Sequence, residues 1–211
     1  MVFTERDREL LGLVYRLGFC LGRHIKELVN FSSYRVCDRR LAVLITAGYL
    51  TRKKYLYGVP YLYTVTHKGR ILIGANKREN KIRLEQINHD IYVIDVLIYF
   101  RDKYALHLND FVTERELHIE DGFGGRKHHP DFVFVSGGKA VAVEVELTAK
   151  SKVRLEKNIR DNYLKYDYQI WLTDNKKVHT LINKIAEQYN NIEVMHLEGV
   201  LEKCRATKPQ G

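Results

Sequence analysis

The chain has 211 residues, which is the usual size of one large domain or two small ones. Apolar residues make up 45% of it, enough for a packed core, and this excludes general disorder. The apolar runs are far shorter than the roughly 20 residues that cross a bilayer, and the N-terminus is charged where a signal peptide would be apolar. Three widely spaced cysteines argue against a disulfide framework or a zinc site. The composition therefore predicts a cytoplasmic protein with no membrane partner.

The net charge of +9 is unevenly distributed along the chain. Residues 1–80 carry 15 lysines and arginines against 6 acidic residues, whereas residues 81–211 carry 20 of each. This partition is typical of a nucleic-acid-binding module joined to a neutral one, the alternative being a solvated basic face without a partner. We expect two domains, over residues 1–78 and 79–211.

The first module begins with helical periodicity. Thr4 precedes an acidic first turn, and apolar residues then recur at helical spacing until Gly18, which predicts an N-capped helix. Similar signals continue down the chain. They predict a helix over 22–29, a helix capped by Ser32 or Ser33 that runs to about Ala47, strands over 49–56 and 61–66, and a turn at 58–60 between these strands.

Three helices followed by a basic hairpin is the order of a winged helix-turn-helix. The stretch AGYLTRKKYLYGVPYLYTVTHKG closely resembles the wing of bacterial members of that family. A recognition helix needs a basic polar face to enter the major groove, and a wing needs cations to reach phosphates. We therefore expect the module to bind double-stranded DNA, and the alternative is a winged helix used for protein dimerisation. The candidate DNA contacts are Arg35, Arg39, Arg40, Arg52, Lys53 and Lys54.

The second module follows a polar segment over residues 75–83. An amphipathic helix is expected over 84–104, and beyond it the apolar pattern changes to that of strands. The further expected elements are strands over 110–118, 131–135 and 140–147, a helix over 152–167, a strand over 168–173, a helix over 177–188 and a strand over 192–196. This order predicts an α/β sandwich with a mixed sheet.

Three carboxylates stand out among these strands. Asp131 opens the second strand, and Glu144 and Glu146 lie two residues apart on one face of the third. Like charges side by side on a central strand repel each other, and buried carboxylates are costly. A divalent cation would offset both effects, because carboxylate oxygens are ligands that Mg²⁺ and Mn²⁺ prefer. The alternative is an edge strand whose acids are solvated.

Pro130-Asp131, a hairpin and Glu144-Val145-Glu146, in an α-β-β-β-α-β order, resemble the PD-(D/E)xK nuclease superfamily. The resemblance implies that Asp131 and Glu144 hold a metal ion. It also implies that residue 146 has the position of the usual lysine, which positions or deprotonates water. This chain has Glu146 there, and we expect that side chain to hold metal or to orient the water.

Other residues complete the expected site. Lys150 or Lys152, just after the third strand, could supply the missing amine and support the developing charge. The superfamily often adds an acid from its first helix, for which Glu85 is the best match by position. Arg126 and Lys127, in a glycine-rich segment, are interpreted as a phosphate clamp on substrate DNA.

The order of the two modules narrows the resemblance. A winged helix, then the helix segment 86–90, His129-Pro130-Asp131 and Glu144-x-Glu146, is similar to the replication-relaxation family of plasmids, integrative elements and phages. The resemblance implies a role in replication or conjugative transfer of such an element. Two functions stay open. One is a DNA endonuclease or nickase dependent on Mg²⁺ or Mn²⁺, and the other is a non-catalytic DNA-binding accessory factor for a replication initiator or relaxase, with a degenerate nuclease fold. The oligomeric state also stays open, a homodimer included.

Overall fold

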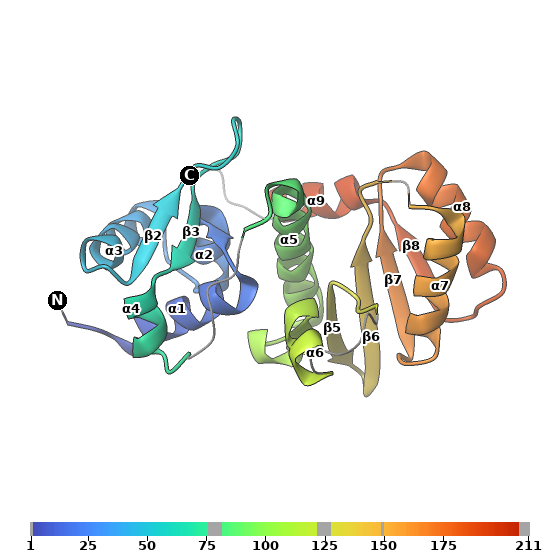
Figure 1. Cartoon of the computed structure of the whole chain (residues 1–211), viewed down its shortest axis with the longest axis horizontal. Coiled ribbons are helices and arrows are strands. Elements are labelled where there is room, and N and C mark those ends of the chain that lie inside the picture. The colour runs from blue at the N-terminus through green and yellow to red at the C-terminus, as the bar shows by residue number, and fades with distance from the viewer. Residues whose placement is uncertain (1, 76–81, 122–127, 149, 207–211) are drawn as a thin grey trace. The chain divides into compact units, whose positions relative to one another are not determined.

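A computed structural model describes residues 2–75, 82–121, 128–148 and 150–206 (Figure 1). It divides into two compact units, Met1–Ile94 and Asp95–Gly211. The division falls inside helix α5 (Ile87–Tyr104), whereas the boundary expected at residue 78 lies outside the described residues. The described residues form an α/β structure, with a small antiparallel sheet in the first unit and a mixed five-stranded sheet in the second.

Short local signals set the limits of the elements in the first unit. Thr4 accepts a hydrogen bond from the amide of Asp7, and Ser33 accepts one from the amide of Val36, so both predicted N-caps are confirmed. Gly18 ends the first helix with a φ of +83°, a conformation that favours glycine. The elements are α1 (Glu5–Leu17), β1 (Cys20–Leu21), α2 (Gly22–Leu28), α3 (Tyr34–Thr46), β2 (Leu50–Lys53), β3 (Leu62–Val65), α4 (His67–Leu72) and the 3-10 helix η1 (Leu84–Gln86).

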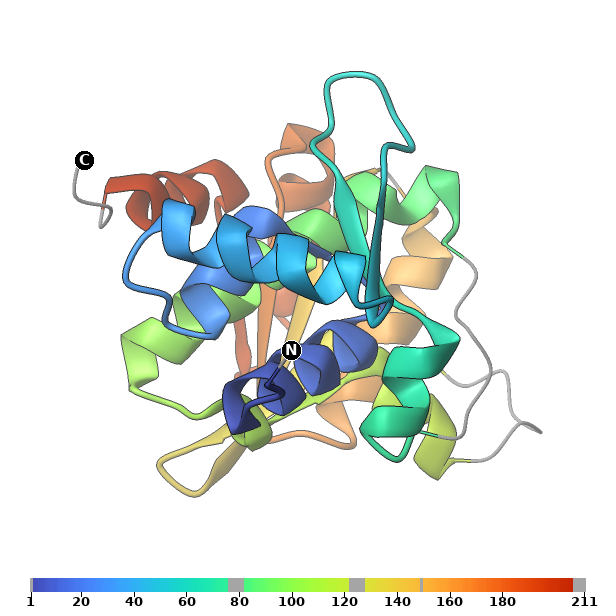
Figure 2. The ribbon, with the colours of Figure 1, turned by 90° about the vertical axis from the view of Figure 1, so that its left-hand side faces the viewer.

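Strand β3 is the centre of the small sheet, with β1 and β2 antiparallel on its two sides. The sequence did not predict β1, because two residues are too few to show a period. It forms through pairing with a distant strand, which sets Cys20 opposite Tyr63. The segment 54–61 between β2 and β3 extends beyond the helices of this unit (Figure 2).

The first turns of α5 belong to the first unit. Ile87 and Ile91 are buried in a cluster with Phe19, Leu21 and Leu62. Side chains of the β2–β3 hairpin are packed against this cluster as well, namely Tyr55, Leu56 and Val59. All three residues belong to the 54–61 loop, so apolar packing against this cluster holds the loop itself.

The second unit contains a sheet with strand order β4-β5-β6-β7-β8, which confirms the predicted mixed sheet. The pairs from β4 to β6 are antiparallel, and those from β6 to β8 are parallel. The elements are η2 (Leu108–Asp110), β4 (Phe111–Thr113), α6 (Glu114–Glu120), β5 (Phe132–Ser136), β6 (Lys139–Val145), α7 (Lys152–Tyr163), β7 (Tyr168–Leu172), α8 (Lys176–Ala186), β8 (Ile192–Met195) and α9 (Leu197–Ala206). None of the helices in the described part of the chain is long and apolar enough to cross a membrane.

The strand predicted over 110–118 is wrong beyond residue 113. The chain turns there into helix α6, because Thr113 and Glu116 form a capping box. The Thr113 hydroxyl accepts a hydrogen bond from the amide of Glu116, and the Glu116 carboxylate accepts one from the amide of Thr113 at 2.8 Å. Two satisfied helix-terminal amides outweigh the alternating pattern that favoured a strand. Helix α9 was not predicted at all.

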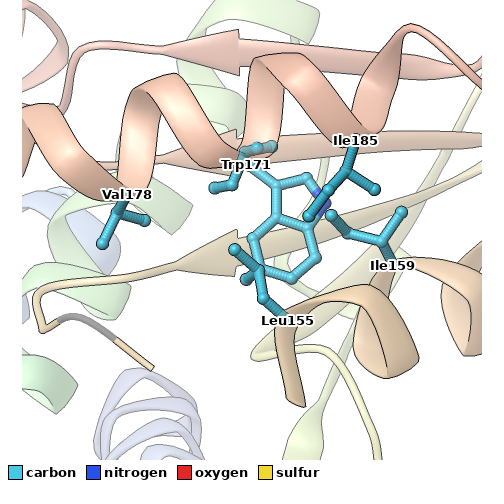
Figure 3. Packing of buried hydrophobic residues seen from close by; sticks show 6 residues of the cluster. Leu155, Ile159, Trp171, Val178 and Ile185 are labelled. Atoms are coloured by element: carbon cyan, nitrogen blue, oxygen red, sulfur yellow. The ribbon is translucent and has the colours of Figure 1, made fainter. Parts of the chain in front are cut away.

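Helices cover both faces of the large sheet (Figure 1). On one face, Phe100 of α5 stacks against Phe134 of β5 with ring centroids 5.5 Å apart. On the other face, Trp171 of β7 is fully buried under α7 and α8 (Figure 3). Its cluster consists of Leu155 and Ile159 from α7 and Val178, Ile182 and Ile185 from α8. This second face is the one from which Glu144 reaches Asn162 of α7.

Candidate functional site

Helix α3 presents a polar, basic face to solvent in the first unit. Its buried side chains, Cys37, Leu41 and Leu44, recur at helical spacing and fasten the helix to the core. Arg35 and Arg39 lie one turn apart and are exposed. Neither forms an ion pair with another residue that the structure describes. Their charges therefore face solvent, as a helix that enters the major groove requires.

The β2–β3 hairpin carries further exposed cations of the first unit. Each of its three exposed cations lies over a tyrosine ring: Arg52 over Tyr61 at 5.1 Å, Lys53 over Tyr55 at 5.2 Å and Lys54 over Tyr57 at 5.8 Å. A cation–π contact orients the long side chain without neutralising its charge. The hairpin therefore offers three oriented cations to an anionic partner.

Arg40, also predicted to contact DNA, is engaged inside the first unit. Its Nε donates to Oδ1 of Asp7 at 2.6 Å, and its Nη2 donates to Oδ2 of Asp7 and to the carbonyl oxygen of Val2. Burial alone would raise the pKa of Asp7, but hydrogen bonds from Arg40 and Thr4 hold that pKa below its ordinary value. Arg40 thus joins α3 to α1, and its guanidinium is committed to the fold.

The three predicted carboxylates of the second unit lie where β5 and β6 meet. Phe132 pairs with Val143, so Asp131 and Glu144 occupy the next position along the same ladder. Asp131 Oδ2 accepts a hydrogen bond from the amide of Val145 at 2.7 Å. Strand β6 ends at Val145, one residue before Glu146, which corrects the strand predicted to Leu147. Glu144 and Glu146 are 4% and 3% exposed.

Glu144 is held by two donors from different elements. Its Oε1 accepts from Nε2 of His128 at 2.5 Å and from Nδ2 of Asn162 at 3.0 Å. Burial raises the pKa of Glu144, and the charge of Asp131 adds to this, although the His128 and Asn162 contacts act in the opposite direction. Sequence reasoning missed Asn162, because an amide on an amphipathic helix carries no motif.

A fourth carboxylate, Glu114, lies beside this pair. It is the first residue of α6, and its amide donates to the carbonyl oxygen of Asp131 at 2.9 Å. Burial raises the pKa of Glu114, and the charges of Asp131 and Glu144 raise it further. Negative charge is therefore crowded at this edge of the sheet. The capping-box motif that begins α6 was the available signal for this placement.

Glu146 has a cationic partner close in the chain. Its Oε2 lies 2.5 Å from Nζ of Lys150, and its Oε1 accepts from the amide of Thr148 at 3.4 Å. Lys152, in contrast, is exposed at the start of α7, 3.5 Å from Oε1 of Glu156. Of the two lysines predicted to replace the missing amine, Lys150 lies at the acidic cluster.

The structure does not place the other residues predicted for this site beside the acidic cluster. Glu85 is exposed in η1 of the first unit, and Arg126 and Lys127 lie outside the described residues. Among the residues that the structure describes, no three His, Cys, Asp or Glu side chains are grouped to hold a metal ion. The chemistry of the carboxylates suits Mg²⁺. In this structure, however, their oxygens are committed to protein donors: Val145, His128, Asn162 and Lys150.

Three buried polar atoms at or near the acidic cluster have no hydrogen-bond partner in the described part of the chain. They are Oε2 of Glu146, whose contact with Lys150 is an ion pair, Nδ1 of His129 and the hydroxyl of Tyr166. Burial and the charge of His118 lower the pKa of His129, whose Nε2 lies 3.2 Å from Oδ2 of Asp121. Burial, followed by the charges of Asp121 and Glu144, raises the pKa of Tyr166 to about 12. Both shifts favour the uncharged forms of His129 and Tyr166.

Comparison of the chain with models of known protein families gives no match, and comparison with curated proteins finds no similar sequence. The resemblances to the winged helix-turn-helix, to the PD-(D/E)xK nucleases and to the replication-relaxation family therefore rest on sequence motifs and element order. They stay predictions.

Proposed function

We propose that the first unit binds double-stranded DNA. The observation that carries this proposal is the set of exposed cations on α3 and on the β2–β3 hairpin, within the part of the chain that holds the whole positive excess. In a winged helix, the third helix contacts base edges in the major groove, and the wing contacts the neighbouring backbone. Arg35 and Arg39 would take the first role, and Arg52, Lys53 and Lys54 the second.

The variant Arg35→Ala/Arg39→Ala tests this interface. We expect weaker binding to a duplex and a flatter dependence of affinity on salt. Both arginines also carry positive charge into the groove between the phosphates, so losing them should reduce the magnitude of the slope of log K against log salt by up to about 1.8, at about 0.9 for each neutralised phosphate. Fluorescence anisotropy of a labelled duplex, measured over a series of salt concentrations, gives both quantities.

A charge-conserving control separates the effect of positive charge from that of specific contacts with base edges. Arg35→Lys/Arg39→Lys keeps both charges but removes the planar fork that binds a guanine in two places. It should retain most of the salt dependence while losing preference among sequences. An alanine variant with wild-type affinity and wild-type slope would overturn the assignment of α3.

A second candidate function is metal-dependent cleavage of the phosphodiester backbone. The crowding of Asp131, Glu144 and Glu114 at one sheet edge favours it, because a fold without a cationic ligand gains nothing from this repulsion. Asp131 and Glu144 would hold Mg²⁺ or Mn²⁺, and a bound ion would supply an activated water and charge stabilisation. Lys150 would remain the amine beside Glu146.

The competing role is a non-catalytic accessory factor for a replication initiator or relaxase. The commitment of the carboxylate oxygens to His128, Asn162 and Lys150 favours it, since these donors already compensate the acids. The resemblance to the replication-relaxation family implies, for the nuclease and for the accessory factor alike, a role in replication or transfer of a plasmid, phage or integrative element.

Calorimetric titration of Mn²⁺ and a nicking assay on supercoiled plasmid distinguish the two roles. If the cluster is catalytic, wild-type protein binds Mn²⁺ and nicks DNA, and Asp131→Asn/Glu144→Gln loses both. Glu156→Gln is the matched control, because that carboxylate is partly exposed on α7 and pairs with Lys152. Wild-type protein that neither binds Mn²⁺ nor nicks DNA would leave the accessory role.

A further inference from the structure

The second unit has no net charge, but its acidic and basic residues lie in different segments. Residues 105–148 contain eight aspartates and glutamates against four lysines and arginines. Residues 150–184 contain nine lysines and arginines against four acidic residues. The second of these segments includes α7 and α8, which pack on the same face of the sheet over Trp171 (Figures 1 and 3). A basic face therefore lies on a unit whose total charge is zero.

The packing of α7 and α8 decides where these cations point. Leu155 and Ile159 on α7, and Val178, Ile182 and Ile185 on α8, are turned toward Trp171. The polar positions between them are left on the outer side of each helix. The exposed cations of this layer are Lys152, Arg154, Lys157 and Arg160 on α7 and Lys176, Lys177 and Lys184 on α8.

Most of these cations have no acidic partner. Lys152 lies 3.5 Å from Glu156 and Lys157 lies 3.9 Å from Asp161, and such exposed pairs contribute little. The others form no ion pair with any residue in the described ranges. They are Arg154, Arg160, Lys176, Lys177 and Lys184, and we name this set the α7–α8 basic face.

An open groove of about 440 Å³ lies along α8 within this face. It is lined by Lys176, Lys177, Thr180, Leu181 and Lys184, of which the last four recur at the spacing of one helix side. Three lysines and a threonine are among the described residues that line the groove, and no aspartate or glutamate is among them. Lysine ammonium and threonine hydroxyl groups are donors that proteins use for phosphate oxygens.

We propose that the α7–α8 basic face is a second contact for the phosphate backbone of DNA. This inference rests on the proposed DNA binding of the first unit, and charge complementarity identifies the occupant. Two contacts on one chain strengthen each other, because binding of the first raises the effective concentration of DNA at the second. The second unit thus adds affinity without adding sequence preference.

The variant Lys176→Gln/Lys177→Gln/Lys184→Gln tests the second contact in the full-length chain. A labelled duplex of about 40 base pairs spans several helical turns and leaves room for both contacts. The variant should bind it more weakly, and the magnitude of the slope of log K against log salt should decrease by up to about 2.7 for three lost contacts. Acetylation of lysines with and without the duplex, read by mass spectrometry, should show protection of all three in the wild type.

Lys139 provides the control, because it is an exposed lysine that belongs to β6 and to neither helix. Lys139→Gln should keep the wild-type slope, and Lys139 should be acetylated equally with and without DNA. Wild-type protein that does not bind the duplex would overturn the proposed function itself. The second contact alone would be overturned if wild-type protein binds the duplex, the triple variant has the wild-type slope, and Lys176, Lys177 and Lys184 of the wild type are not protected from acetylation.

Discussion

Replacing Trp171 with alanine is expected to lower the free energy of unfolding of the second unit by about 3–5 kcal/mol. The indole is fully buried between the sheet and helices α7 and α8 (Figure 3), and its Nε1 donates to Oε1 of Gln169 at 3.2 Å. Its removal leaves a cavity that the two helices cannot close without losing their own contacts. Urea denaturation followed by far-UV circular dichroism measures the loss.

Val135→Ala provides the comparison for Trp171→Ala. Val135 lies on β5 of the same sheet but is 55% exposed, so its truncation should change the free energy of unfolding by only about 0.5 kcal/mol. If the two variants were equally stable, Trp171 would not be the centre of this core.

Replacing Arg40 with alanine is expected to destabilise the first unit by about 3 kcal/mol. The substitution leaves the buried carboxylate of Asp7 without its guanidinium partner, which costs more than the loss of an exposed charge. Arg39→Ala is the matched control, because Arg39 is the neighbouring residue on α3 and is exposed. It should change stability by no more than about 0.5 kcal/mol. Thermal unfolding of both variants gives the comparison.

The same ion pair predicts how stability depends on pH. The pKa of Asp7 is lower in the folded chain than its ordinary value of 3.8, so the folded state holds the proton less tightly than the unfolded state. The contribution of this carboxylate is present above pH 3.8 and is lost as the pH falls through the folded pKa. Arg40→Ala should lose this part of the acid dependence. Identical acid unfolding of wild type and Arg40→Ala would show that the pair contributes nothing.

Elements that depend on neighbouring residues could be predicted from the sequence. The caps at Thr4 and Ser33 act within a few positions, and the structure contains both of them. The error in the strand predicted over 110–118 also concerns a signal between neighbouring residues. Its capping box is also a local signal, but the alternating pattern was given more weight than Thr113 and Glu116.

The proximity of Asp131 and Glu144 could also be predicted, because a hairpin with a tight turn determines which residues lie opposite each other. The side chains that donate hydrogen bonds to those carboxylates could not be predicted from the sequence. His128 precedes β5 and Asn162 belongs to α7, and they meet at Glu144 only after the helix packs on the sheet. Pairing between strands follows from spacing, whereas contacts between layers depend on how whole elements pack.

The sequence by itself determined the order of the elements, the mixed sheet, the basic character of the first 80 residues and the pairing of two acids. Only the tertiary structure decided which charges are free to act. Arg40 is bound to Asp7, 33 positions away, while Arg39 beside it faces solvent. The cations of α7 and α8 form one face because both helices bury their apolar sides against Trp171. A charge has the same sign anywhere in the chain, but its availability depends on partners and burial that arise only when distant segments pack together.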